Sequence, residues 1–168
     1  MEKLWYKKPA MIWQQALPIG NGFTGVMIYG GKRKEKLSFN DGTLWSGYPK
    51  DQTNPQSLRF LSKVRELIFA GKNTDAMTLT EEKLCGAYSE AFMPLGDLNL
   101  KFNNKFIKNY KRELDLSNAI HTVSFDGTTR EIFASFPDKV VAYRITGKKH
   151  FSMKLSANSK LKSNIVVD

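Results

Sequence analysis

The chain has 168 residues, of which 41% are hydrophobic and 25% are charged. This length and composition are typical of one globular domain with its own core and exclude two ordinary domains. The formal net charge of +10 does not indicate nucleic-acid binding, because the basic residues are scattered over predicted turns and strand edges and form no continuous basic helix face.

No apolar run approaches the roughly 20 residues that a membrane span requires, so no membrane partner is expected. The first residues, MEKLWYKKPAMIW, lack an apolar stretch of about 7–15 residues ahead of a small-residue cleavage site. No secretory signal is therefore expected, and the chain is cytoplasmic unless such a signal has been removed. Cys85 is the single cysteine, and we expect it to be a small buried or half-buried apolar residue.

Residues 25–41, GVMIYGGKRKEKLSFND, predict a hairpin. An apolar run ends at Gly30 and Gly31, and alternation follows through Leu37 and Phe39. A glycine pair between two such segments is typical of a tight turn between antiparallel strands.

Residues 53–86 predict two short helices, placed around residues 55–85. Asn54 or Thr53 caps the first, Pro55 lies in its first turn and Gly71 ends it. Asn73 is expected to cap the second, which stops near residue 86. An apolar stripe at helical spacing consists of Leu58, Leu61, Val64, Leu67 and Ile68. We expect this inserted pair to cover the rest of the fold and not to act as a functional lid.

Short strands follow from residue 96 onwards. Leu98, Leu100 and Phe102 share one face. Residues 119–127 predict another strand, which alternates imperfectly through Ile120, Val123 and Phe125 and ends at the turn dipeptide Asp126–Gly127. Further strands are predicted within residues 129–136, 139–146 and 151–157, at the spacing of an antiparallel meander. The predicted fold class is mainly all-β, an antiparallel β-sandwich of the super-sandwich type with the inserted helical pair.

The residues offer little material for nucleophilic or metal chemistry. His121 and His150 are the only histidines, whereas a catalytic triad needs a positioned base and a zinc site needs three or four ligands. The glycines of GNGFTG, residues 20–25, precede a strand and no helix, so they predict a loop with unusual dihedral angles and no dinucleotide site. We expect no metal and no cofactor.

Four carboxylates could in principle form the pair that cleaves a glycosidic bond. They lie beside glycine, proline or aromatic residues and are Asp41, Asp97, Glu131 and Asp138. Aspartates at turns usually bond their own backbone, so a structural role is favoured for each and no catalytic residue is assigned.

The tryptophans lie in the first third of the chain, at Trp5, Trp13 and Trp45. An indole can stack on the apolar face of a sugar or anchor a loop in a core. Packing is the favoured interpretation for Trp45 and Trp13, each taken alone.

Several stretches together resemble the N-terminal domain of glycoside hydrolase family 95, the family of α-L-fucosidases that act on terminal α-1,2-linked fucose, with some relatives active on α-L-galactosides. The resemblance runs from about Pro9 to about Thr146 and rests on PAMIWQQALPIGNGFTGVMIYGG, LSFNDGTLWSGYPKDQTNP, LIFAGKNTDA, PLGDLNLKF, YKRELDLSNAIHTVSF and REIFASFPDKVVAYRIT.

The resemblance implies a large antiparallel β-sandwich and an inverting parent enzyme. In the family, a general-acid Glu and a water activated through Asn and Asp lie on a following (α/α)₆ barrel. Residues 1–168 would form one β-sandwich domain, truncated, without that barrel, and no residue here matches a catalytic position. The implied partners are the catalytic barrel and, through the parent enzyme, a fucosylated glycan. Exposed sheet edges would promote self-association.

The segment from Phe39 to Pro49 departs slightly from the family, which commonly has Asn-Glu-Asp-Thr-Leu-Trp-Ser-Gly where this chain has NDGTLWSG. It retains Asn40, Thr43 and Trp45, which are the substrate-adjacent or interdomain candidates. In one interpretation the loop supports the rim of the fucose pocket, with Trp45 as an apolar wall. In the other, Trp45 only locks the loop into the sandwich.

Three functions remain at this point. The leading one is a non-catalytic sandwich that packs on and positions a catalytic barrel. The alternatives are a free carbohydrate-binding module without hydrolytic activity, and a hydrolase that uses a carboxylate pair of its own.

Overall fold

A computed structural model describes residues 2–87, 89–103, 107–147, 152–164 and 166. The chain divides into two compact units. The sandwich unit comprises Met1–Leu44 and Met93–Asp168, and the helical unit comprises Trp45–Phe92. Each unit is described by itself. None of the described helices is long and apolar enough to cross a membrane.

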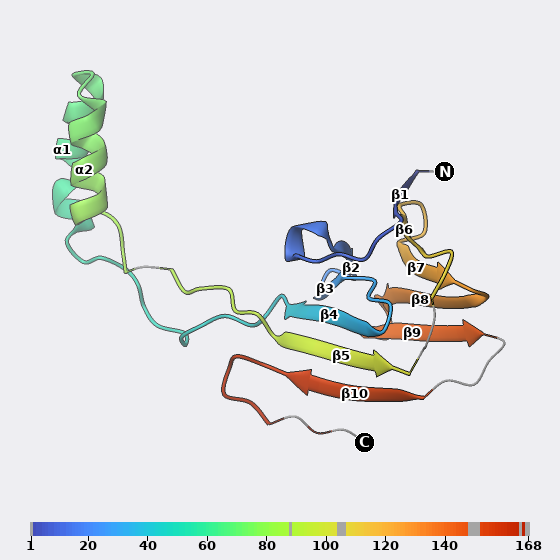
Figure 1. Ribbon diagram of the computed structural model, residues 1–168. Coiled ribbons are helices and arrows are strands. Elements are labelled where there is room, and N and C mark those ends of the chain that lie inside the picture. Colours follow the sequence, from blue (N-terminus) through green and yellow to red (C-terminus); the bar gives the residue numbers. More distant parts are fainter. Residues whose placement is uncertain (1, 88, 104–106, 148–151, 165, 167–168) are drawn as a thin grey trace. The chain divides into compact units, whose positions relative to one another are not determined.

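The sandwich unit consists of two five-stranded antiparallel sheets (Figure 1). The first sheet has the order β1 (Lys3–Tyr6), β6 (Lys111–Asp115), β7 (Ile120–Phe125), β8 (Thr128–Ser135) and β9 (Val140–Gly147). The second has the order β10 (Met153–Asn158), β5 (Gly96–Phe102), β4 (Lys34–Asp41), β3 (Thr24–Ile28) and β2 (Leu17–Gly20). A short 3₁₀ helix, Trp13–Gln15, precedes β2. The predicted β-sandwich is confirmed.

One apolar core joins the two sheets. In β7 every second side chain is buried, and in β4 Glu35 and Leu37 are buried, because alternate residues of a strand point to opposite faces. Residues of both sheets meet in a single cluster, namely Leu17, Ile19, Val26, Ile28, Leu37, Leu100, Phe102, Leu114 and Ile132. Each fully buried aliphatic side chain contributes roughly 1.5–3 kcal/mol relative to exposure.

The predicted hairpin is present as β3 and β4, with Ile28 opposite Leu37. Glycine is required in its turn. Gly30 has a positive φ of 69°, and a Cβ on Gly31 would lie 1.7 Å from the carbonyl oxygen of Lys34. No other residue fits the second position without moving the backbone.

Two features of the sheets differ from the sequence-based expectation. Strands β1, β2 and β6 were not predicted, and β10 does not continue the meander of β7, β8 and β9. It crosses to the second sheet and pairs with β5, with Met153 opposite Phe102 and Leu155 opposite Leu100. This pairing places the apolar positions of β10 on the core face of the second sheet, although Leu155 remains 42% exposed.

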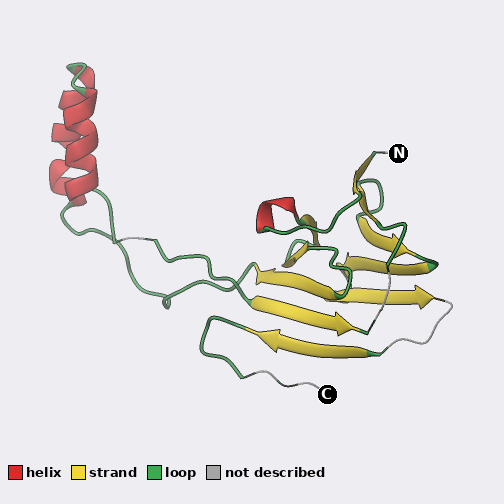
Figure 2. Cartoon of the chain, in the orientation of Figure 1, coloured by secondary structure: helices red, strands yellow, loops and turns green. Residues whose placement is uncertain are grey.

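The predicted helical pair is confirmed as α1 (Ser57–Phe69) and α2 (Asn73–Lys83) (Figure 2). Gly71 ends α1 with a φ of 72°, and the amide of Lys72 donates to the carbonyl of Leu67 at 2.9 Å. The expected cap of α1 by Asn54 or Thr53 was wrong: the N-cap is Gln56, and no side-chain hydrogen bond caps that end. The Asn54 side chain instead accepts a bond from the amide of Gln56 at 3.0 Å, in the turn before the helix.

Two further local expectations were wrong. Asn73 does not cap α2; it is the first residue of the helix, and no side-chain hydrogen bond caps that end. Cys85 is exposed and not buried, because it lies just after α2, where its carbonyl accepts a bond from Asn54. The idea that the helical pair covers the sandwich stays a prediction.

Candidate functional site

The loops at one end of the sandwich unit form the candidate site. We call this region the loop end; it comprises residues 20–24, 39–44, 93–97, 135–139 and 158–164. These segments meet because β2, β4, β8 and β10 finish here, and β3, β5 and β9 begin here. Loops carry binding residues on many β-sandwiches, since the strands below hold them in place.

Asn21 links the two sheets at the loop end. Its side-chain oxygen accepts bonds from the amides of Phe23 at 3.0 Å and Thr24 at 2.8 Å. Its side-chain nitrogen donates to the carbonyl of Ser135 at 2.8 Å. The loop also needs Gly22 at a positive φ of 86°, as the sequence predicted for these glycines. The bridge made by Asn21 was not predicted, because its partner lies in a distant turn.

An exposed aromatic pair lies above this bridge. The rings of Phe23 and Phe136 stack with centroids 5.7 Å apart, and the Lys139 ammonium lies 5.1 Å from the centroid of Phe23. Phe136 is 64% exposed. Nothing in the sequence pattern brought these two phenylalanines together.

Asn40 and Thr43 lie at the loop end, both exposed. Asn40 is the penultimate residue of β4 and lies opposite Gly25. The Thr43 hydroxyl and amide donate to the Asp41 carboxylate at 2.5 and 2.9 Å, and these bonds lower the pKa of Asp41. Asp41 therefore shapes the turn that presents Thr43.

Trp45 belongs to the helical unit. Its ring packs edge-on against Phe92, with centroids 5.3 Å apart. The amide of the next residue, Ser46, donates to the carbonyl of Ala91 at 2.8 Å, and its hydroxyl donates to Glu90 at 2.8 Å. Trp45 is thus held in place, yet it remains 53% exposed.

A shallow hollow of about 320 Å³ lies beside the ends of β4, β5 and β10. Phe39, Leu95 and Leu98 supply apolar lining, and Asp97 and Asn158 supply polar lining. It is an open surface feature of mixed character, and its carboxylate is already engaged within the fold.

Asp97 accepts a hydrogen bond from the Ser38 hydroxyl at 2.6 Å and forms an ion pair with Lys36 at 3.1 Å. Burial raises its pKa, but the bonds from Ser38 and Lys36 outweigh burial, and the pKa lies below its ordinary value. A carboxylate in this state favours the charged form and is not poised to donate a proton.

The other candidate carboxylates are also held by structural partners. Glu131 accepts two bonds from Arg144 at 2.9 and 2.6 Å across β8 and β9. Asp138 accepts the Ser135 hydroxyl at 2.5 Å within its turn. Within the described part of the chain, no group of three or more His, Cys, Asp and Glu residues could hold a metal ion.

His121 is fully buried, and burial lowers its pKa to about 3, with the charge of Arg112 acting in the same direction. It is therefore neutral and shielded from solvent, which does not suit a general base. His150 lies outside the described residues.

The opposite end of the sandwich contains a buried charged network that the sequence did not predict. Glu35 accepts bonds from the amides of Gly31 at 3.0 Å and Lys36 at 3.1 Å. Arg130 donates to the carbonyls of Gly31 at 2.7 Å and Lys32 at 2.8 Å. The second carboxylate oxygen of Glu35 lies 3.9 Å from Arg130. These contacts fix the β3–β4 turn.

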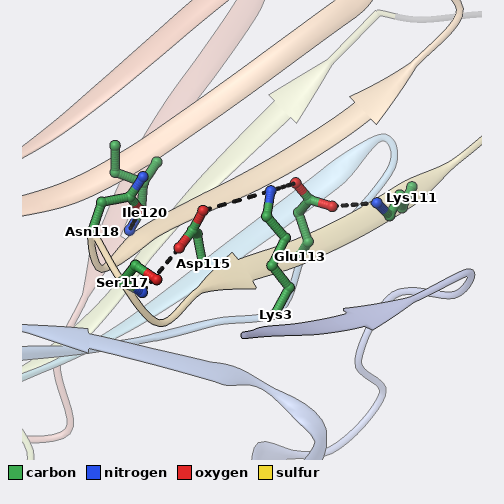
Figure 3. A network of polar contacts seen from close by, with 7 residues as sticks. All are labelled: Lys3, Lys111, Glu113, Asp115, Ser117, Asn118 and Ile120. Carbon is green, nitrogen blue, oxygen red and sulfur yellow. Dashed lines mark hydrogen bonds and ion pairs between the residues drawn. The ribbon is translucent and has the colours of Figure 1, made fainter. Parts of the chain in front are cut away.

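A surface network ties β1 to β6 (Figure 3). Lys3 lies 3.0 Å from Glu113 and 3.6 Å from Asp115, and Lys111 pairs with Glu113 from the other side. The bond from Lys111 is the largest cause that lowers the pKa of Glu113. Asp115 is buried, whereas the lysines are exposed. Ion pairs at the surface contribute little stability each, and here they align an N-terminal edge strand.

Comparisons with known proteins agree with this fold. A family model described as glycosyl hydrolase family 65, N-terminal domain, matches residues 4–167. α-L-Fucosidase 2 of Arabidopsis thaliana is 38% identical over 169 residues, which cover 95% of this chain and 20% of the relative. Probable α-fucosidase A of Aspergillus niger is 32% identical over 143 residues, covering 78% of this chain and 18% of the relative. Probable α-fucosidase A of Aspergillus oryzae is 30% identical over 158 residues, covering 84% of this chain and 21% of the relative.

These matches confirm the resemblance to the N-terminal domain of a glycoside hydrolase. The family model is described under number 65, whereas the motifs resemble family 95, and the names of the relatives agree with the α-fucosidase assignment. The chain spans about a fifth of the length of these relatives, which is consistent with a domain of a larger enzyme. A free carbohydrate-binding module is not favoured.

The buried carboxyl of Glu35 gives the stability of the chain a pH dependence. Burial raises its pKa from 4.5 to about 7, and the bonds from Gly31 and the charge of Arg130 offset this only in part. Between these two values the folded state binds more protons than the unfolded state, so stability falls as the pH rises from about 4.5 to about 7.

We therefore expect Glu35→Gln, which mimics the protonated form, to gain stability relative to the original chain on going from pH 5 to pH 8. The gain should approach about 3 kcal/mol, because each unit of pKa shift corresponds to about 1.4 kcal/mol. Urea unfolding at the two pH values measures it, with the surface change Glu131→Gln as control. An equal difference in free energy of unfolding between Glu35→Gln and the original chain at both pH values would contradict the raised pKa of Glu35.

Proposed function

Because the chain belongs to the family of glycosyl hydrolase family 65 N-terminal domains, we propose that it is the non-catalytic β-sandwich domain of an α-L-fucosidase. In this proposal the domain packs on and positions a catalytic (α/α)₆ barrel. The larger protein hydrolyses terminal α-L-fucosyl linkages with inversion and binds fucosylated glycan at the barrel. The observation that carries the proposal is 38% identity to an α-L-fucosidase over 95% of this chain, which covers only 20% of that enzyme.

The geometry supports a scaffold role. Inverting hydrolysis needs two carboxyl groups facing one cleft with room for a water between them. Asp41, Asp97, Glu131 and Asp138 instead bind Thr43, Ser38, Arg144 and Ser135 respectively. The histidine of the described core is buried and neutral. Bond cleavage is therefore assigned to the rest of the enzyme.

We propose Asn40, Thr43 and Trp45 as the residues that face the barrel or the rim of its substrate pocket. Asn40 and Thr43 are exposed, and Thr43 is oriented by Asp41. Trp45 is oriented by Phe92 and keeps about half of its surface exposed. Side chains that are exposed but already oriented bind a partner with a smaller loss of conformational entropy.

The edge strand β10 supports self-association of the isolated chain as part of this proposal. Met153 and Leu155 lie on its core-facing side and are 44% and 42% exposed. An exposed apolar edge strand is a template for pairing with another strand.

The scaffold role predicts that the purified chain releases no fucose. Incubation with 2′-fucosyllactose, followed by chromatography of the products, should give no fucose above a protein-free blank. A full-length relative such as the Arabidopsis enzyme serves as the positive control. Fucose release that is lost in Asp97→Asn or Glu131→Gln would overturn the proposal and assign catalysis to this chain.

The interdomain role of Trp45 is tested by Trp45→Ala in the full-length protein. We expect kcat/KM to fall by about tenfold or more, equivalent to about 1.4 kcal/mol. The melting temperature of the isolated chain should stay nearly unchanged, because the side chain is half exposed. Trp13→Ala removes another exposed tryptophan and is the matched control. A large fall in melting temperature with near-normal kinetics would show that Trp45 only locks its own loop.

A further inference from the structure

Three lysines form a row across the outer face of the second sheet. Lys34 of β4 lies directly opposite Lys101 of β5, and Lys101 lies directly opposite Lys154 of β10. All three are exposed. Figure 1 shows the three strands side by side. We call these three residues the lysine row.

This arrangement opposes the stability of the sheet. Neighbouring strands lie about 4.8 Å apart, so the row places like charges on adjacent strands at directly opposed positions. Lysine is common on the solvent face of edge strands, and this is enough to explain Lys154. It does not explain Lys34 or Lys101, because β4 and β5 are inner strands. Residues that break a local rule of stability are expected where a function requires them.

The lysine row is not neutralised within the described part of the chain. The outward positions of β4, β5 and β10 carry four lysines and one acid, Asp97, an excess of three positive charges. Asp97 is occupied by Lys36 and Ser38. No ion pair joins a described residue to any lysine of the row. Elsewhere, the network of Figure 3 pairs Lys3 and Lys111 with carboxylates.

The rest of this face carries neutral hydrogen-bonding groups. Asn99 lies opposite Ser156 and next to the row, and its side-chain nitrogen donates to Asn158 at 2.8 Å. Tyr29 lies beyond Lys36, whose ammonium is 5.2 Å from the ring centroid. Amides and hydroxyls suit sugar hydroxyl groups, and an aromatic ring suits the apolar face of a sugar.

We propose that the outer face of β4, β5 and β10 binds an anionic polysaccharide, whose sulfate or carboxylate groups lie along the lysine row. That the ligand is a saccharide rests on the proposed function. That the ligand is negatively charged follows from the positive charge of the lysine row. The row runs across the strands, so a bound chain would lie across them, with successive anionic groups on successive lysines. The site holds the polymer and performs no chemistry.

Calorimetry of the whole chain with three polymers tests the proposal. The probes are dextran sulfate, polygalacturonate and neutral dextran, which separate sulfate, carboxylate and uncharged saccharide. We expect binding of at least one anionic polymer and none of neutral dextran. The variant Lys34→Gln, Lys101→Gln, Lys154→Gln should bind about tenfold or more weakly. Its melting temperature should equal or exceed that of the original chain, because repulsion within the sheet is removed.

A charge-matched control is Lys63→Gln, Lys72→Gln, Lys160→Gln, three exposed lysines outside the row. Its affinity for the anionic polymer should lie within about twofold of that of the original chain. This difference is well below the 1.4 kcal/mol that corresponds to a tenfold change in affinity. An equal loss in both variants, or no preference for anionic over neutral dextran, would overturn the site. A single-stranded oligonucleotide that binds through the row more tightly than either polymer would overturn the saccharide assignment. The fucose-release assay uses a neutral substrate, so its result does not depend on the lysine row. Failure of the proposed function in that assay is therefore distinguishable from failure of the polysaccharide site in the calorimetry.

Discussion

The guanidinium of Arg130 is the contact on which the sandwich most depends. Arg130 belongs to the first sheet, is 1% exposed, and donates to the carbonyls of Gly31 and Lys32 in the β3–β4 turn of the second. Its guanidinium carbon Cζ lies 3.8 Å from the centroid of the Phe102 ring. A buried charge is costly unless it is paired and hydrogen-bonded, and Glu35 supplies the opposite charge. These hydrogen bonds hold the β3–β4 turn against the opposite sheet. Fixing the turn also fixes the register of the strands that lead to the loop end.

The loop end depends on this clamp and on a second one at the other end of the strands. Asn21 connects the loop before β3 to the carbonyl of Ser135 at the end of β8, so the two sheets are tied at both ends. Between the two ties lies the common apolar core. A support fixed in this way can present Asn40 and Thr43 in one orientation, which is what a positioning domain requires. The same support holds the strands β4, β5 and β10, whose outer face displays the lysine row.

The alternation of apolar residues was enough to predict the strands that contain Leu37, Leu100 and Val123, and the glycines were enough to predict the turn at Gly30 and the end of α1 at Gly71. The buried network could not be predicted, because alternation assigns Glu35 and Arg130 no special role until the facing sheet is known. Strand β10 was placed in the wrong sheet, since its pattern fits either neighbour and only the match of Leu155 to Leu100 decides it. Asn40, Thr43 and Trp45 were visible as motif residues. The pair Phe23–Phe136 required knowledge of which loops of the two sheets meet, and the lysine row required the register between β4, β5 and β10.

The role of Arg130 as the cross-link between the sheets is tested most directly by urea unfolding of Arg130→Met at pH 8, where Glu35 is largely ionised. The account predicts a loss of about 3–5 kcal/mol, because removing one partner leaves the other as an uncompensated buried charge. Arg144→Met is the matched control on the neighbouring strand, since its ion pair with Glu131 is exposed and should cost about 1 kcal/mol or less. A loss for Arg130→Met no larger than that for Arg144→Met would contradict the account.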